Sequence, residues 1–173
     1  MQLGSAALSL VLMSTLASAP ARAIDPGTVQ GHLQYGKQRH ELRHVQAVRN
    51  PNNPKRVWIL LTTAEISVKD AADPAAVMAL AASGKLRGVR LNVDAAAPNA
   101  SELQGALLLG KEDAPGGEVV FGASGEKFWE RLAAGDKRIG GALRYPREAS
   151  PGGSPAWTID VSFSAPVFGK AGG

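Results

Sequence analysis

The sequence contains no cysteine and only three histidines among its 173 residues. The lack of cysteine excludes disulfide bonds, thiolate metal ligands, a thiol nucleophile and a lipid-modified cysteine. No apolar run reaches the roughly 20 residues that a membrane-spanning helix needs. The net charge of +4 is small. Any metal site must therefore be built without thiolate ligands, and charge alone does not define a partner.

What is present begins with an apolar run, Ala6–Leu16, followed by the triplet Ala21-Arg22-Ala23. This arrangement is typical of a secretory signal peptide. It predicts cleavage after Ala23. An earlier triplet, Ala17-Ser18-Ala19, is an alternative that leaves Pro20 at the new terminus.

These signals predict three parts: a signal peptide over residues 1–23, a single β-rich domain over 24–168 and a flexible tail over 169–173. The protein is expected to be exported and to be periplasmic or extracellular after cleavage. No transmembrane segment is expected in the mature chain.

Short stretches of alternating apolar and polar residues, separated by Gly, Pro, Asn and Asp, predict an antiparallel β domain. The expected strands are Thr28–Tyr35, Arg39–Val48, Arg56–Thr63, Gly88–Asp94, Leu103–Leu109, Glu118–Gly122, Arg138–Tyr145 and Trp157–Ala165. The predicted fold class is mainly β, an antiparallel sandwich or small barrel of about eight strands with one helix packed on it.

The helix is predicted over Asp73–Leu86. Asp73 can accept hydrogen bonds from the first free amides, Pro74 suits the first helical position, and Gly84 can end the helix. A second, shorter helical turn is possible over Glu126–Ala134, where apolar side chains recur at helical spacing.

HELRH, residues 40–44, matches the H-E-x-x-H pattern of zinc peptidases. On a helix, histidines four residues apart lie on one face and bind one zinc ion, while the glutamate activates the bound water. This interpretation makes His40 and His44 zinc ligands, Glu41 the general base and Glu65 a third ligand. It requires residues 37–49 to be helical.

The neighbouring sequence favours a strand instead. Alternation over 28–35 followed by Gly36-Lys37 predicts a hairpin in which Tyr35 pairs with Gln38. The face of Leu33 and Tyr35 then carries His40, Leu42, His44 and Val48, while Arg39, Glu41 and Arg43 face out beside His32. On a strand, residues four apart are about 13 Å apart. We therefore expect no cofactor, with zinc only under the peptidase alternative; a site that joins His32 to another histidine requires a three-residue loop.

Residues 37–56 also form a basic segment. Its candidate binding residues are Lys37, Arg39, Arg43 and Arg49. Such cations can contact the phosphates of nucleic acid or of an anionic envelope component, or simply keep a strand face soluble. If these cations bind phosphates, the binding should weaken as the salt concentration rises.

Four short motifs resemble a loose set of uncharacterised exported bacterial proteins. They are G-x-L-x-x-G from Gly31 to Gly36, E-L-x-H-x-x-A from Glu41 to Ala47, S-G-K-L-x-G from Ser83 to Gly88 and V-x-F-x-A-P from Val161 to Pro166. In that set the position of His40 is apolar, which implies that HELRH is incidental. The resemblance implies the architecture and export only, and it indicates no particular activity.

The sequence thus predicts an exported, non-enzymatic β domain that binds an envelope component, a partner protein or a small apolar ligand. The alternative is a small zinc metallopeptidase that uses HELRH.

Overall fold

The computed structural model describes residues 27–114, 117–151 and 153–169. The predicted signal peptide and residues 170–173 of the predicted tail lie outside this part of the chain. None of the helices that the structure describes is long and apolar enough to cross a membrane.

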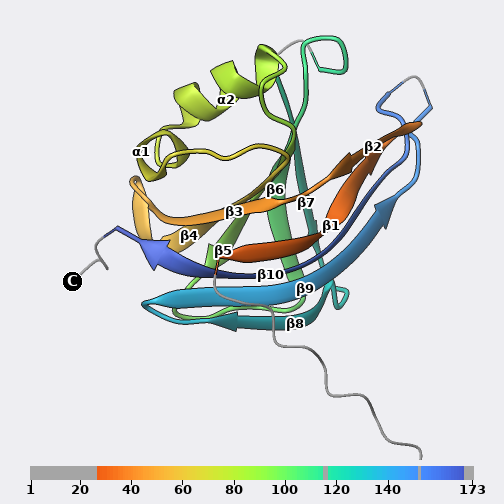
Figure 1. The fold of residues 1–173 in the computed structure, drawn as a ribbon. Coiled ribbons are helices and arrows are strands. Elements are labelled where there is room, and N and C mark those ends of the chain that lie inside the picture. The colour runs from red at the N-terminus through yellow and green to blue at the C-terminus, as the bar shows by residue number, and fades with distance from the viewer. Residues whose placement is uncertain (1–26, 115–116, 152, 170–173) are drawn as a thin grey trace, which may run out of the picture.

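The described chain is mainly β, with two short helices (Figure 1). The strands are β1 Thr28–Tyr35, β2 Gln38–Glu41, β3 His44–Asn50, β4 Asn53–Thr62, β5 Gly88–Asp94, β6 Glu102–Leu108, β7 Glu118–Ser124, β8 Trp129–Ala134, β9 Arg138–Arg147 and β10 Trp157–Phe168. The helices are α1 Val68–Ala71 and α2 Pro74–Ala82. The predicted fold class is confirmed, and β1 and β5 have the predicted bounds.

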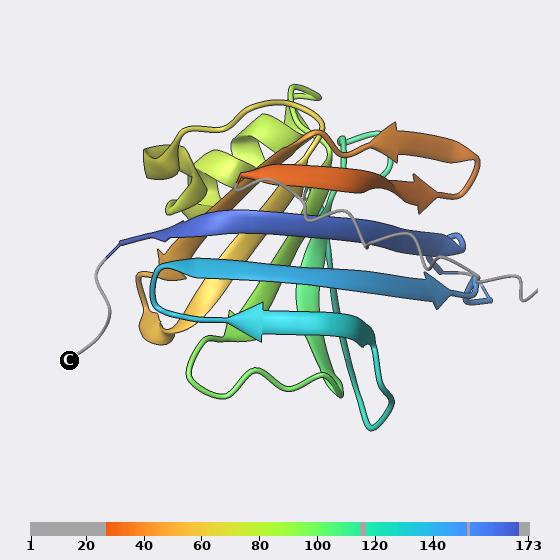
Figure 2. The same ribbon diagram turned by 60° about the horizontal axis from the view of Figure 1, so that its bottom comes forward.

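The strands form two antiparallel layers that are joined where β10 meets β3 (Figure 2). We call β2-β1-β10-β9-β8 sheet A and β3-β4-β5-β6-β7 sheet B. At the end of β10, Val167 and Phe168 pair in parallel with Ala47 and Val48 of β3. This link makes one curled, mixed sheet, a half-barrel whose two layers cover each other.

The main core fills the space between the layers. Its aromatic part includes Phe121, Phe128, Trp129, Trp157 and Phe163, each less than 8% exposed. A second cluster lies on the outer face of sheet B, where α1 and α2 cover Val48, Trp58, Leu60 and Leu108. The interior is therefore packed with side chains, and the functional surfaces lie outside it.

The predicted helix is confirmed as α2. The Asp73 carboxylate accepts a hydrogen bond from the Ala75 amide, Pro74 begins the helix, and Gly84 follows it with a φ of 77°. Val77 and Ala81 pack toward sheet B. The cap and the apolar face thus determine both the start and the orientation of the helix.

The predicted strand Arg39–Val48 is wrong as a single element. The Leu42 amide donates to the Gly31 carbonyl in β1, and the next amide, Arg43, donates to the Thr62 carbonyl in β4. The chain therefore leaves sheet A and enters sheet B at this point. Val48 consequently lies in the helix-side cluster, not on the face of Leu33 and Tyr35.

The possible helical turn over Glu126–Ala134 is also wrong. Residues Trp129–Ala134 form β8, which pairs with β9, and the register shifts between Trp129 and Arg131. This irregularity allows Trp129 and Leu132, three residues apart, both to face the main core, which Phe128 enters from the loop before the strand. Pairing with β9 and burial of two aromatic rings outweigh the local helical pattern.

Candidate functional site

The five residues of HELRH lie across the change of sheet. His40 and Glu41 belong to β2, whereas His44 begins β3. The predicted hairpin register is confirmed, because Tyr35 pairs with Gln38 and Leu33 with His40. The helical geometry that the zinc motif requires is absent at these residues.

The candidate metal ligands are only partly brought together. His44 and Glu65 line one surface hollow of about 240 Å³, beside Gln46 and Phe168. His40 instead faces Arg87 and Asp113, which influence its charge. Among the described residues, no group of three or more His, Cys, Asp and Glu side chains is arranged to hold a metal ion. The described side chains therefore do not fit a zinc centre.

Glu41 occupies the outward position predicted for it. Its carboxylate accepts a hydrogen bond from Arg39 Nε at 2.7 Å, and Arg39 Nη1 lies 3.3 Å from His32 Nε2. The bond from Arg39 lowers the pKa of the Glu41 carboxyl. The outer face of the hairpin is therefore a charge-paired, solvated surface.

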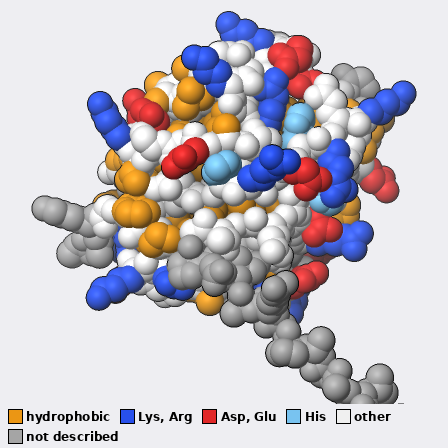
Figure 3. All heavy atoms as spheres, in the orientation of Figure 1, with side chains coloured by type: hydrophobic (Ala, Val, Ile, Leu, Met, Phe, Trp, Pro, Cys, Tyr) orange, Lys and Arg blue, Asp and Glu red, His pale blue; other side chains and the backbone are white. Residues whose placement is uncertain are grey.

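The basic segment does not present its four cations together. Arg49 is 9% exposed and donates to the Asp136 carboxylate and to the Pro54 carbonyl. Arg39 is paired with Glu41, which leaves Lys37 and Arg43 as exposed members. Figure 3 shows basic and acidic side chains mixed over the face that Figure 1 presents. The predicted patch thus has little net positive charge.

His40 provides a pH-dependent contribution to stability. Its Nε2 and the Oδ2 of Asp113 are both buried without a hydrogen-bond partner in the described ranges. Burial, assisted by Arg87 and opposed by Asp113, lowers the pKa of His40 below its ordinary value. The folded protein therefore favours the neutral ring.

We expect the free energy of unfolding to fall as the pH drops below about 6.5, because the unfolded chain then binds more protons at His40 than the folded chain does. The slope from one group cannot exceed about 1.4 kcal/mol per pH unit. Urea unfolding between pH 5 and 7 measures it. The variant His40→Gln should lose this slope. An unchanged slope in this variant would exclude His40 as the source of the slope. The carboxyl groups whose pKa is lowered, such as that of Glu41, do not contribute between pH 5 and 7, because they change the stability only below about pH 4.5.

A larger hollow lies on the outer face of sheet B, beyond the part that the helices cover. This groove has a volume of about 460 Å³. We call it the sheet B groove; its lining residues are Trp58, Arg90, Asn92, Gln104, Gly105, Ala106, Val120, Phe121 and Gly122. They come from four adjacent strands, β4 to β7, so the groove crosses the sheet.

Alternation along the strands explains this lining. Val89, Leu91 and Val93 point into the main core, so Arg90 and Asn92 between them point outward. Small residues, Gly105, Ala106 and Gly122, stand beside large ones and leave the hollow open. At Gly122, an added Cβ would meet nothing closer than the Leu103 carbonyl oxygen at 3.9 Å.

The polar groups of the groove are fixed in place. The Arg90 guanidinium lies over the Trp58 ring, 5.4 Å from its centre, and Arg90 Nη2 donates to the Glu118 carboxylate at 3.0 Å. Arg90 Nη1 and Asn92 Oδ1 are buried without hydrogen-bond partners among the described residues. The groove thus combines apolar surface with a guanidinium that Trp58 and Glu118 hold in place.

Sequence reasoning missed the groove. The sequence feature that could have indicated it is a set of polar and small residues at the outward positions of three predicted strands, including Arg90, Gln104 and Gly122. That signal shows which residues face outward, but the order of strands in the sheet decides which of them are neighbours. Trp58 had no local signal, because it lies in an otherwise apolar run.

Comparison with known proteins adds no relative: no family model, no curated protein and no solved structure matches this chain.

Proposed function

We propose that this protein is an exported, non-enzymatic binding domain that holds a partner protein in the sheet B groove. The observation that carries the proposal is the groove itself, a hollow of about 460 Å³ on the face that α1 and α2 leave open. The signal peptide predicted over residues 1–23 supports export.

The chemistry of the groove favours a polypeptide. Trp58, Ala106 and Val120 supply apolar surface, while the exposed Gln104 supplies an amide that matches the hydrogen-bonding groups of a peptide backbone. The Glu118 carboxylate balances the charge of Arg90, so the groove does not select strongly anionic ligands.

A photo-crosslinking side chain placed at the exposed Gln104 tests the proposal. In envelope extracts of the producing cell it should join the protein to a discrete partner, whereas the same group at Gln30, an exposed glutamine on β1, should not. The variant Gly122→Phe should reduce the adduct at least tenfold, because Gly122 lines the groove, has room for a Cβ and would place a ring where the partner binds.

Gly135→Phe is the matched control. Gly135 lies in the exposed β8–β9 turn, where an added Cβ also meets nothing closer than 3.7 Å. It should leave the adduct unchanged. Equal adducts from Gln104 and Gln30, or a full yield with Gly122→Phe, would contradict the proposed function.

A further inference from the structure

One edge of sheet B is open. Within the described ranges β7 pairs only with β6. The Leu109 amide donates to the Gly117 carbonyl and the Gly125 amide donates to the Ser101 carbonyl, which fixes the alternation of hydrogen bonds between the two strands. Odd-numbered residues of β7 therefore bond toward β6. The amides and carbonyls of Glu118, Val120, Gly122 and Ser124 point away, toward the open edge.

The other edges carry features that oppose pairing, whereas no residue that the structure describes protects this one. Edge strand β2 has four residues, of which Arg39 and Glu41 are charged. Edge strand β8 carries a register shift and the charged residues Glu130 and Arg131. Both are common defences against pairing with another chain. In contrast, β7 has seven residues in regular register, and none after Glu118 is charged.

Apolar surface borders the open edge on both faces. On the outer face Val120 is 73% exposed, beside the groove. On the inner face Val119, Ala123 and Tyr145 are only partly buried against the main core. Figures 1 and 2 both show sheet A extending past β7. An extra strand here would continue sheet B over that extension.

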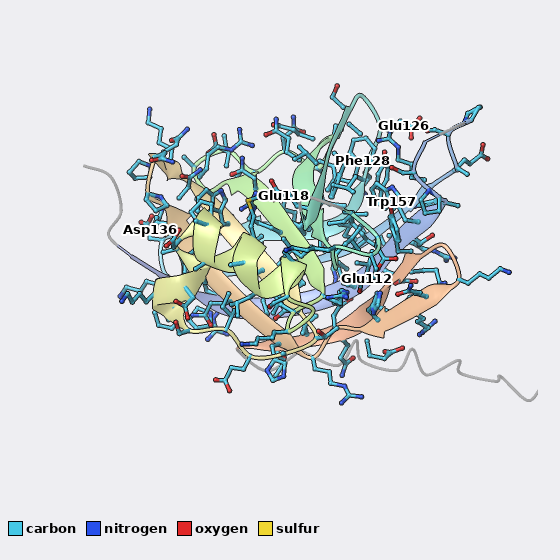
Figure 4. All side chains as sticks on the ribbon, turned by 90° about the horizontal axis from the view of Figure 1, so that it is seen from above. Glu112, Glu118, Glu126, Phe128, Asp136 and Trp157 are labelled. Atoms are coloured by element: carbon cyan, nitrogen blue, oxygen red, sulfur yellow. The ribbon has the colours of Figure 1, made fainter. Side chains whose placement is uncertain are left out.

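The surroundings also define the charge of an occupant. Between Glu118 and Glu126 no side chain is ionisable. Figure 4 shows Glu118 near the end of α2 and Glu126 on the far side of Phe128. An uncharged segment therefore matches the length of β7, since a charge in its centre would lose hydration against Val119 and Tyr145 without gaining a partner.

We propose that β7 accepts an extended, uncharged segment of the partner protein as an additional strand. This segment has β-branched or small apolar side chains at alternate positions and contains no proline. This inference rests on the proposed function and specifies how the partner is held. The backbone hydrogen bonds supply affinity, and the groove beside Val120 receives side chains of the added strand.

The probe is a fluorescent peptide with the sequence KTVTVTVTK, compared with KTPPTPPTK, in which proline removes amides from both edges. The first peptide should bind with a dissociation constant below about 1 mM and the second should not. In amide NMR spectra of the protein, the signals of Glu118, Val120, Gly122 and Ser124 should shift more than those of Val119, Phe121 and Ala123.

Two variants separate edge pairing from other binding. Val120→Pro removes an amide that makes no bond within the sheet, so the fold tolerates it, and Val120→Lys adds an edge charge. Each should weaken peptide binding at least tenfold, whereas Ala133→Lys on the β8 edge should not. Undetectable binding to the unchanged protein, equal binding by the Val120 variants, or amide shifts centred on β2 or β8 would overturn the inference.

The same variants distinguish this failure from failure of the proposed function. If Gln104 still joins a partner in Val120→Pro, the groove binds without an added strand. If the peptide pairs with β7 but Gln104 joins nothing, the edge is open and the groove is not the partner's site.

Discussion

Replacing Trp129 by alanine is expected to lower the free energy of unfolding by about 3–5 kcal/mol. The side chain is 1% exposed, its ring centre lies 6.3 Å from that of Phe163, and its Nε1–H donates to the Glu102 carbonyl at 3.1 Å. Alanine leaves a cavity between the sheets and removes that donor. Urea unfolding monitored by far-ultraviolet circular dichroism measures the loss. In a domain of ordinary stability this is a large fraction of the total.

Trp129→Phe is the control, because it keeps an aromatic ring and removes the indole N–H. We expect it to cost about 1–2 kcal/mol. Gly141 shows how closely the indole is packed: a Cβ there would stand 3.1 Å from Trp129 Cζ3. A cost for alanine that does not exceed the cost for phenylalanine would show that the cavity has collapsed, contrary to this expectation.

Replacing Gly31 by alanine is expected to cost about 3 kcal/mol or more, by combining backbone strain with overlap. Gly31 lies in β1 with a φ of 138°, a conformation that side chains rarely permit. Its Cβ would overlap the Asp160 carbonyl oxygen and stand 2.7 Å from Val161 Cα in β10. Backbone of the central strand cannot move aside as a flexible side chain can. Thermal and urea unfolding of the variant measure the effect.

Gly36→Ala separates the two contributions. Gly36 also has a positive φ, 56°, but an added Cβ there meets only the Pro155 side chain, at 3.6 Å. It should cost about 1–2 kcal/mol from conformation alone. Equal losses at Gly31 and Gly36 would mean that β1 and β10 separate without penalty, and the close approach would then have no energetic role.

Local patterns predicted most of the fold because every described strand except β2 has one face in the main core. Val89, Leu91 and Val93 alternate with outward-facing residues, and that alternation identifies a strand without knowledge of its neighbours. The helix was predictable for a similar reason, since Asp73 and Pro74 mark its start. These signals are short-range, and so are the features that they predict.

The errors arise where distant residues decide. The end of β2 depends on which carbonyl the Leu42 and Arg43 amides meet, and those carbonyls belong to Gly31 and Thr62. The strand β8 depends on a register with β9 that accommodates Phe128 and Trp129 together. No window of local sequence contains this information.

The candidate site follows the same division. HELRH is a local pattern, and its chemical meaning depends on a helix that the sheets do not allow. The sheet B groove, in contrast, is marked by no local pattern and depends on which strands are neighbours in the sheet. Trp58, Arg90, Gln104 and Val120 come from four strands and become neighbours only through the order β4-β5-β6-β7.

The position of β10 has a consequence for folding kinetics. This strand lies between β1 and β9 and also joins β3, yet the ribosome makes it after every other described strand. Thr28 must find Ser164, and Ala47 must find Val167. Contacts so remote in sequence give a high contact order, which slows folding. A nascent chain of this topology therefore cannot complete sheet A until its synthesis is nearly finished.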